Sequence, residues 1–180
     1  MPAHIVLLRG INLGSRNRIS MPELRGALED AGFKSVRTHL QSGNIVLESR
    51  AKPETVRRKV ERVIEEQFGL EIDVVVRSRE ELAKIAKRNP LGSVAKDPKR
   101  YQVSFLSGEL ATEVVRRLQS LAVNGERLEV AGREVYAWHP RGVARSRLWA
   151  ELAGKRLGVT ATSRNWATVK ALVALADADR

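Results

Sequence analysis

Residues 36–48, VRTHLQSGNIVLE, decide the fold that the sequence predicts. Val36–Leu40 and Ile45–Glu48 have the β-branched and aliphatic residues that are typical of short strands. Between them, Gln41-Ser42-Gly43-Asn44 has the residue types of a tight turn. The stretch therefore predicts a β-hairpin.

The flanking segments extend this hairpin to the order β-α-β-β-α-β. Before it, an aliphatic strand is followed by a loop and by a helix whose start has a capping box, Ser20 with Glu23. After it, a helix with apolar residues at three- and four-residue spacing leads to another strand. This is the order of split βαβ, ferredoxin-like domains. The expected elements are a strand at 3–9, a helix between Ser20 and Gly32, the hairpin, a helix between Pro53 and Gly69, and a strand at 72–76.

The second half of the chain begins a similar order. Ser78 with Glu81 predicts another capping box and a helix to about Arg88, and breakers at 89–92 and 97–98 follow it. The expected later elements are a strand at 101–106, a helix at 110–121, a hairpin of strands 127–130 and 134–138, and helices at 146–157 and 165–177. We therefore expect an α+β protein of two ferredoxin-like (split βαβ) subdomains. Residues 1–88 form the first, and residues 89–180 form a βαββα subdomain followed by an extra C-terminal helix.

The composition restricts the chemistry. The chain has no cysteine, which excludes disulfides, thiolate catalysis and cysteine-ligated metal centres. Its three histidines form no metal-ligand pattern, so we expect neither a metal nor a cofactor. There is no signal-peptide pattern and no apolar run of about 18–20 residues, so we expect a cytoplasmic protein without a membrane partner. The oligomeric state is not indicated.

The charge is strongly positive. Lys and Arg number 32 against 21 Asp and Glu, a formal net charge of +11. Such a balance favours anionic partners, either nucleic acid or a phosphorylated small molecule. The alternative is a genomic habit with charge spread over solvated faces, because the basic residues are scattered along the whole chain.

Residues 9–20, RGINLGSRNRIS, form the strongest candidate site. Loops between a strand and a helix typically hold about 2–6 residues, and longer ones are more often functional. Glycines let the backbone approach a ligand, and the arginines with the following helix start would hold an anion. The segment is neither a Walker A loop nor a G-x-G-x-x-G turn. Its candidate ligand-binding residues are Arg9, Gly10, Asn12, Gly14, Arg16, Asn17 and Arg18; the alternative is a structural loop held by its own asparagines.

The predicted hairpin turn offers Ser42 and Asn44 as further candidates. We expect this turn at the end of the sheet opposite the start of the first helix, which favours a plain turn. No nucleophile elbow surrounds Ser42, so a serine nucleophile is not expected.

Two later segments add basic groups. Thr162, Arg164 and Asn165 precede the last expected helix, where an anion would find hydroxyl, guanidinium and amide donors. The alternative is helix capping, with Trp166 in the core. Arg141 and Arg145 lie in residues 140–147, PRGVARSR, whose three arginines flank Trp138, His139 and Trp149. Arginines with aromatic neighbours favour nucleic acid over metal, and the alternative is a solvated loop with both tryptophans buried.

Four segments in order resemble one known family: LLRGINLG at 7–14, THLQSGN at 38–44, NP at 89–90 and TSRNWAT at 162–168. They resemble the bacterial domain-of-unknown-function family numbered sixteen ninety-seven, along essentially the whole chain. The resemblance implies a two-part α+β fold and no established reaction, substrate or cofactor. Family members usually carry basic residues after the glycine loop, as Arg16 and Arg18 are here. Some have tyrosine where His39 stands, which argues against a catalytic His39.

Three functions remain open from the sequence. The first is a phosphate-recognising protein that binds nucleic acid or a nucleotide through the glycine loop and the arginine-rich segments. The second is an enzyme acting on a small phosphorylated metabolite, with Arg9, Arg164 and Asn12 stabilising charge. It requires the glycine loop and the Arg164 segment to face one pocket. The third is an interaction module without chemistry, pairing through edge strands. No catalytic residue is assigned.

Overall fold

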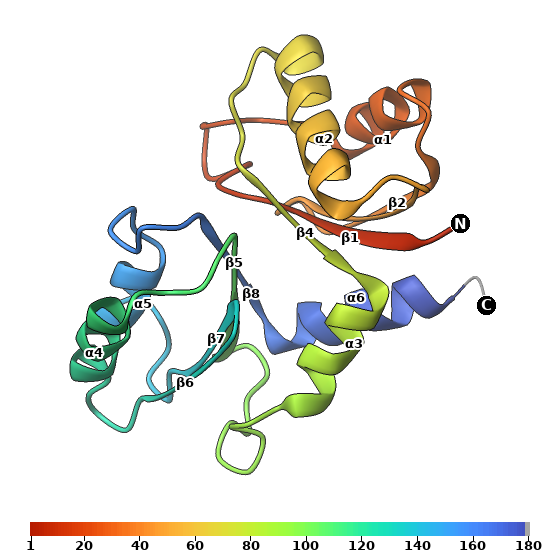
Figure 1. Cartoon of the computed structure of the whole chain (residues 1–180). Coiled ribbons are helices and arrows are strands. Elements are labelled where there is room, and N and C mark those ends of the chain that lie inside the picture. Colours follow the sequence, from red (N-terminus) through yellow and green to blue (C-terminus); the bar gives the residue numbers. More distant parts are fainter. Residues whose placement is uncertain (179–180) are drawn as a thin grey trace. The chain divides into compact units, whose positions relative to one another are not determined.

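The computed structural model describes residues 1–178 of the chain. These residues form two four-stranded antiparallel sheets and six helices (Figure 1). The chain divides into two compact units: unit 1 contains Met1–Lys84 and the residues from Leu172 onward, and unit 2 contains Ile85–Ala171. None of the helices within residues 1–178 has the length and apolar composition needed to span a bilayer.

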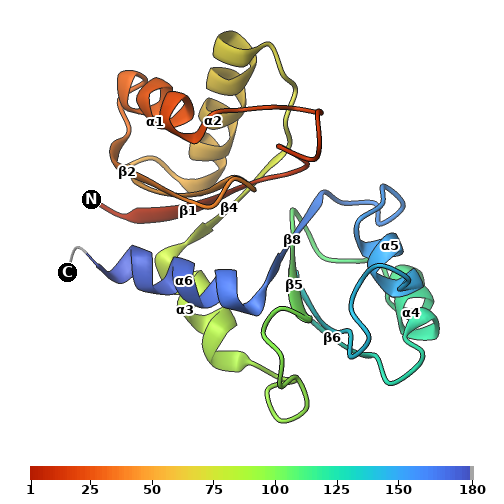
Figure 2. The ribbon, with the colours of Figure 1, turned by 180° about the vertical axis from the view of Figure 1, so that it is seen from behind.

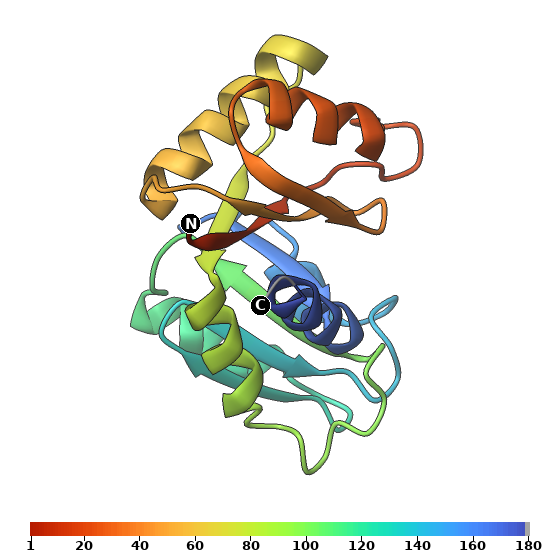
Figure 3. The same ribbon diagram turned by 90° about the vertical axis from the view of Figure 1, so that its right-hand side faces the viewer.

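The sheet of unit 1 has the strand order β2-β3-β1-β4. Each neighbouring pair is antiparallel, an arrangement compatible with the split βαβ prediction. Helices α1 and α2 lie on the same side of this sheet (Figure 3). The elements are β1 (Ala3–Leu8), α1 (Met21–Asp30), β2 (Lys34–His39), β3 (Asn44–Glu48), α2 (Pro53–Phe68), β4 (Val74–Ser78) and α3 (Arg79–Arg88), the last of which also contributes residues to unit 2.

Local signals in the sequence account for the helix boundaries of unit 1. Ser20 caps α1 by accepting a hydrogen bond from the backbone N of Glu23 at 3.4 Å. At the start of α3 the capping box is reciprocal: the Glu81 carboxylate accepts from the Ser78 backbone N at 2.7 Å, and the Ser78 hydroxyl accepts from the Glu81 backbone N at 3.0 Å. Gly69 ends α2 with a φ of +66°, a conformation that glycine adopts without strain.

The core of unit 1 lies between this sheet and its two helices. Alternate residues of β1, such as Val6 and Leu8, face the apolar sides of α1 and α2 and are fully buried, as are Leu24 and Val60 of the helices. Burying one such aliphatic side chain is worth about 1.5–3 kcal/mol. The core thus fixes the sheet on which the glycine loop and the hairpin are carried.

Unit 2 repeats this organisation with the strand order β6-β7-β5-β8. Helices α4 and α5 lie on one side of its sheet (Figure 2). Within unit 2, the ring of Trp166 at the start of α6 stacks on Tyr101 with 4.7 Å between centroids, and the Tyr136 hydroxyl donates to the carbonyl of Ile85 at 2.8 Å. The elements are β5 (Tyr101–Leu106), α4 (Thr112–Leu121), β6 (Arg127–Ala131), β7 (Glu134–Trp138), α5 (Arg147–Leu152), β8 (Ala161–Asn165) and α6 (Trp166–Asp177).

Two sequence-based expectations for unit 2 are wrong. Residues 161–165 form strand β8, although they were expected to be a loop followed by the first residue of the last helix. The segment ATSRN lacks the apolar run of a strand, and it pairs because β5 offers it a free edge, with Val103 opposite Arg164. The helix expected at 146–157 ends at Leu152, so that a turn and a loop precede β8.

Candidate functional site

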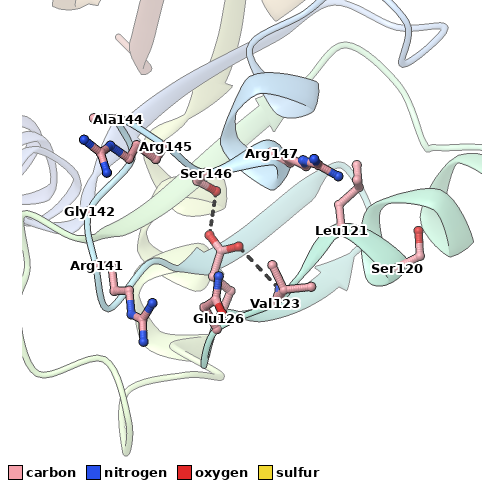
Figure 4. Close-up of a pocket in the computed structure, with 11 residues that line it drawn as sticks. Ser120, Leu121, Val123, Glu126, Arg141, Gly142, Ala144, Arg145, Ser146 and Arg147 are labelled. Carbon is pink, nitrogen blue, oxygen red and sulfur yellow. Dashed lines mark hydrogen bonds between the residues drawn. The ribbon is translucent and has the colours of Figure 1, made fainter.

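The larger of the two described pockets lies in unit 2. It has a volume of about 740 Å³, within the range of roughly 300–1,000 Å³ that is usual for small-molecule sites. Its walls come from the end of α4, the turn before β6 and the loop from β7 to α5, hereafter the basic loop (residues 139–146) (Figure 4). The lining residues are Ser120, Leu121, Val123, Asn124, Glu126, Arg141, Gly142, Ala144, Arg145, Ser146 and Arg147.

Three arginines give this pocket its charge. Arg141 and Arg145 belong to the basic loop, and Arg147 begins α5. All three side chains are exposed, and within residues 1–178 none of their guanidinium groups has a hydrogen-bond or ion-pair partner. Arginine stays charged at any physiological pH and offers five donors in a planar fork, so these groups are available to an anion.

Glu126 is the only acidic residue that lines the pocket, and its carboxylate is already engaged. One oxygen accepts from the Ser146 hydroxyl at 2.5 Å and lies 2.6 Å from Nδ1 of His139. The other accepts from the Val123 backbone N at 3.4 Å. The Glu126 side chain is only 8% exposed, and its hydrogen bonds join the two segments that form the pocket.

Ser146 and His139 complete this buried cluster. The Ser146 hydroxyl donates to Glu126 and accepts from the backbone N of Trp149 at 3.0 Å, so it caps α5. His139 is fully buried, its ring meets the Trp149 ring edge-on at 5.9 Å, and its Nε2 has no partner within residues 1–178. Ser146 Oγ also lies 3.3 Å from His139 Nδ1. Because its shorter bond, 2.5 Å, directs the hydroxyl proton at the Glu126 carboxylate, the cluster holds the two walls of the pocket together.

The sequence predicted one wall of this pocket. Arg141 and Arg145 were singled out, and Arg147 lay in the same basic segment. The opposite wall, from Ser120 to Glu126, was missed because nothing in its composition marks it. The register of the predicted hairpin could have identified this wall. Arg127 pairs with Trp138, which places Glu126 beside His139.

The glycine loop of unit 1 is largely closed by its own hydrogen bonds. Asn12 Nδ2 donates to the carbonyl of Ile19 at 3.0 Å and to that of Gln41 at 2.6 Å, while Asn12 Oδ1 accepts from the Ile19 backbone N at 2.8 Å. Asn17 Nδ2 donates to the Gly10 carbonyl at 3.0 Å, and Arg18 donates to the Gly14 carbonyl at 3.0 Å.

Part of this loop lines a cavity. Asn12, Arg18, Ile19 and Ser20, together with Gln41 of the hairpin turn, line a smaller pocket of about 370 Å³. Arg16 is exposed, whereas Arg9 is half-buried and its backbone N donates to the Asp73 carbonyl at 3.0 Å. Gly10 and Gly14 both have positive φ values, +66° and +59°. The asparagines therefore hold the loop in shape, and its arginines are unequal in their freedom to meet a ligand.

The hairpin turn lies beside the glycine loop, and the expectation that it lies at the other end of the sheet is wrong. Strand β3 runs antiparallel to β1, so Asn44 at its start pairs with Leu7 at the end of β1. The Asn12–Gln41 bond joins the two segments. Asn44 itself is buried and donates to the His39 carbonyl at 2.8 Å and to the Ser42 hydroxyl at 2.9 Å, which stabilises the turn.

The three candidates around β8 line neither described pocket. Arg164 is 7% exposed and donates to the Thr162 hydroxyl at 2.7 Å and to the Ser163 carbonyl at 2.9 Å. Burial lowers the pKa of Arg164 to about 10, because the charged form loses solvation. Thr162 is also buried, and Asn165 caps α6 by accepting from the Thr168 backbone N at 2.9 Å. The described residues contain no group of three or more histidine and acidic side chains able to hold a metal ion.

Comparison with known proteins gives a family and a fold. The model of a family described as "Protein of unknown function (DUF1697)" matches residues 1–136, which include the glycine loop and the hairpin. The solved structure of conserved bacterial protein SP0830 from Streptococcus pneumoniae is similar, with a TM-score of 0.80 and 22% sequence identity over 98% of this chain and 99% of that one. At this identity the likeness shows the shared fold alone. A search of curated proteins found no match.

Proposed function

The chain belongs to the DUF1697 family of proteins of unknown function, and we propose that it recognises phosphate groups, binding a nucleotide or a nucleic acid in the basic pocket of unit 2. One observation carries this proposal: three arginines that have no partner within residues 1–178 line a cavity whose only lining carboxylate is occupied. The strand orders of both sheets support a ferredoxin-like scaffold for each unit.

The chemistry of the pocket suits a phosphate group. Guanidinium groups match the oxygens of a phosphate in pairs, and such charge-assisted bonds are about twice as strong as neutral ones. The net charge of +11 adds a long-range attraction for any polyanion. The long-range field brings the ligand close, and the unpartnered arginines hold it.

The proposal contains no reaction. Ser146, His139 and Glu126 bond to one another and to the backbone, and we assign them a structural role beneath the pocket. The enzyme hypothesis required the glycine loop and the Arg164 segment to line one pocket. Neither described pocket has both in its lining.

The test is a binding titration with salt. Fluorescence anisotropy of labelled single-stranded RNA and DNA should show an affinity that falls with salt at a slope of about −0.7 for each phosphate contacted. The double variant Arg141→Ala/Arg145→Ala should bind about tenfold more weakly, a loss of about 1.4 kcal/mol shared by two exposed contacts.

The matched control is Arg16→Ala/Arg18→Ala in the glycine loop, which removes the same charge from unit 1. The affinity of this variant should stay within about twofold of the wild-type value. The variant lowers the net charge of the protein, and with it the long-range attraction, but leaves the residues of the basic pocket in place. Equal losses in the two double variants would contradict a site in the basic pocket. Absence of binding to any nucleic acid or nucleotide at low salt would remove the proposal altogether.

A further inference from the structure

We infer that the basic pocket is selective for a phosphomonoester, the doubly charged phosphate at the end of a molecule, over the phosphodiesters inside a nucleic-acid strand. This inference rests on the proposed function and narrows it to one ligand chemistry. Charge balance, the arrangement of the arginines and the remaining space in the pocket support it.

The charge of the pocket matches a dianion. Its lining contains three arginines and one glutamate, three positive charges and one negative, which leaves a net charge of +2. A phosphomonoester carries about −1.5 to −2 at pH 7, whereas a phosphodiester carries a single negative charge. A monoester therefore balances the pocket, and a diester leaves an arginine uncompensated.

The arginines lie on one short stretch of the chain, residues 141–147, and at different sides of the pocket. Figure 4 shows Arg141 and Arg145 on one side of Glu126 and Arg147 on the other, with the Arg145 and Arg147 side chains directed away from each other. A protein that follows a strand uses a positive groove along the backbone with aromatic side chains for the bases. Here the lining of the pocket includes no aromatic residue on which bases could stack. A terminal phosphate has three free oxygens to meet donors from several directions.

The rest of the pocket leaves room for an uncharged organic group. The volume of about 740 Å³ is far larger than one phosphate needs, and the wall away from the basic loop is formed by Leu121, Val123, the Ser120 hydroxyl and the Asn124 amide. Such a wall accepts an apolar or hydroxylated body. The ligand is thus a phosphomonoester of such a body, which is found both at the end of a nucleic acid and in a free phosphorylated metabolite.

The experiment compares ligands that differ only in the terminal phosphate. The same fluorescent single strand is measured with a 5′-phosphate and with a 5′-hydroxyl, and adenosine 5′-monophosphate, a sugar monophosphate and inorganic phosphate are tested as competitors. We expect the 5′-phosphate to bind about tenfold more tightly than the 5′-hydroxyl, and Arg147→Ala to abolish that difference. If a free monophosphate displaces the labelled strand at a lower concentration than the unlabelled 5′-phosphorylated strand does, the ligand is a phosphorylated metabolite. If the unlabelled strand displaces it at the lower concentration, the ligand is the end of a nucleic acid.

A pH series gives an independent readout. The second pKa of a phosphomonoester is about 6, so its charge falls from two to one below that pH while the arginines stay charged. Affinity for adenosine 5′-monophosphate should fall severalfold as the pH is lowered through this range. Adenosine 5′-monosulfate, which keeps one charge throughout, is the matched control and should bind weakly at every pH. A parallel fall for both ligands would contradict the inference.

Failure of the inference can be told from failure of the proposed function. If both strands bind equally and Arg141→Ala/Arg145→Ala weakens both, the pocket recognises phosphodiesters; the inference is then overturned and the proposed function stands. If no strand, mononucleotide or inorganic phosphate binds at low salt, both are overturned. Because the three arginines are exposed and have no partner within residues 1–178, their variants should keep the wild-type circular dichroism spectrum.

Discussion

The two units have the same strand order but carry their long loops at opposite ends of their sheets. Equivalent bonds show the correspondence: the backbone N of Leu8 donates to the Gly43 carbonyl in unit 1, and that of Leu106 donates to the Arg133 carbonyl in unit 2, both at 2.9 Å. Unit 1 joins its first strand to its first helix through residues 9–20, whereas unit 2 uses residues 107–111. Conversely, the loop from the third strand to the second helix spans 49–52 in unit 1 and 139–146 in unit 2.

This difference teaches that loop length alone does not make a binding site. In the long loop of unit 1, the side chains of Asn12 and Asn17 donate hydrogen bonds to backbone carbonyls of the same loop. In unit 2 one buried carboxylate, Glu126, holds the long loop, which leaves its arginines without partners in the described chain. What distinguishes the two loops is whether their polar groups are satisfied internally.

The largest expected effect is the loss of the asparagine that closes the unit 1 loop. In Asn12→Ala the buried Ile19 loses the acceptor for its backbone N and the donor to its carbonyl, and alanine replaces asparagine at a φ of +53°. Unsatisfied buried groups and left-handed backbone together should destabilise the protein by about 3 kcal/mol. Urea unfolding followed by far-UV circular dichroism measures the change.

Asn124→Ala is the matched control in unit 2. Asn124 has a φ of +55°, is exposed, and its side chain makes no hydrogen bond within residues 1–178. Only the conformational cost remains, so the loss should be about 1 kcal/mol. Equal losses in the two variants would show that backbone strain, and not the hydrogen bonds of Asn12, sets the stability of the loop.

The part of the fold that local signals specify was predictable from the sequence. The boundaries of α2 follow from Pro53 and Gly69, and those of β5 from the alternation of apolar and polar residues in YQVSFL, so both predictions are confirmed to the residue. Strand β8 was not predictable, because its residues form a strand only through pairing with β5. Tertiary context overrides propensity there.

Only part of the candidate site was predictable from the sequence. Composition marks the arginines of the basic loop, which are neighbours in sequence. Glu126 becomes part of the site only through the register of the β6–β7 hairpin, and Leu121 only through the position of α4 over the sheet. The adjacency of the glycine loop and the Gln41 turn was predicted wrongly, although the antiparallel course of β1 and β3 requires it.

A smaller effect is expected from the helix caps of the two units. Ser146→Ala removes the acceptor for the Trp149 backbone N and one of the bonds to the buried Glu126, so it should destabilise the protein by about 2 kcal/mol. Ser20→Ala removes a single exposed bond of 3.4 Å to the Glu23 backbone N and should cost about 0.5 kcal/mol. Thermal and urea unfolding compare the two, and a Ser20 variant as damaging as the Ser146 variant would contradict the structural role given to the cluster under the pocket.

The smallest expected effect contrasts an arginine that is satisfied with those that are not. On α2, Arg57 donates to both Glu54 and Glu61, and the hydrogen bond from Arg57 holds the pKa of Glu54 below its ordinary value of 4.5. Because the folded pKa is the lower one, the pair stabilises the fold above the ordinary pKa, and this contribution is lost as the pH falls through the folded value.

Arg57→Ala should therefore raise the pKa of Glu54 toward 4.5, and its stability should differ from the wild type at neutral pH but converge with it in acid. A carboxyl carbon-13 titration of Glu54 measures the shift. Arg58→Ala is the control, since Arg58 acts on Glu54 through charge alone and is the weakest of the causes, so it should move the pKa far less. Equal changes of the Glu54 pKa in the two variants would show that nearby positive charge, and not the hydrogen bond from Arg57, causes the shift. Hydrogen bonding to carboxylates would then not be the property that distinguishes Arg57 from the arginines of the basic pocket.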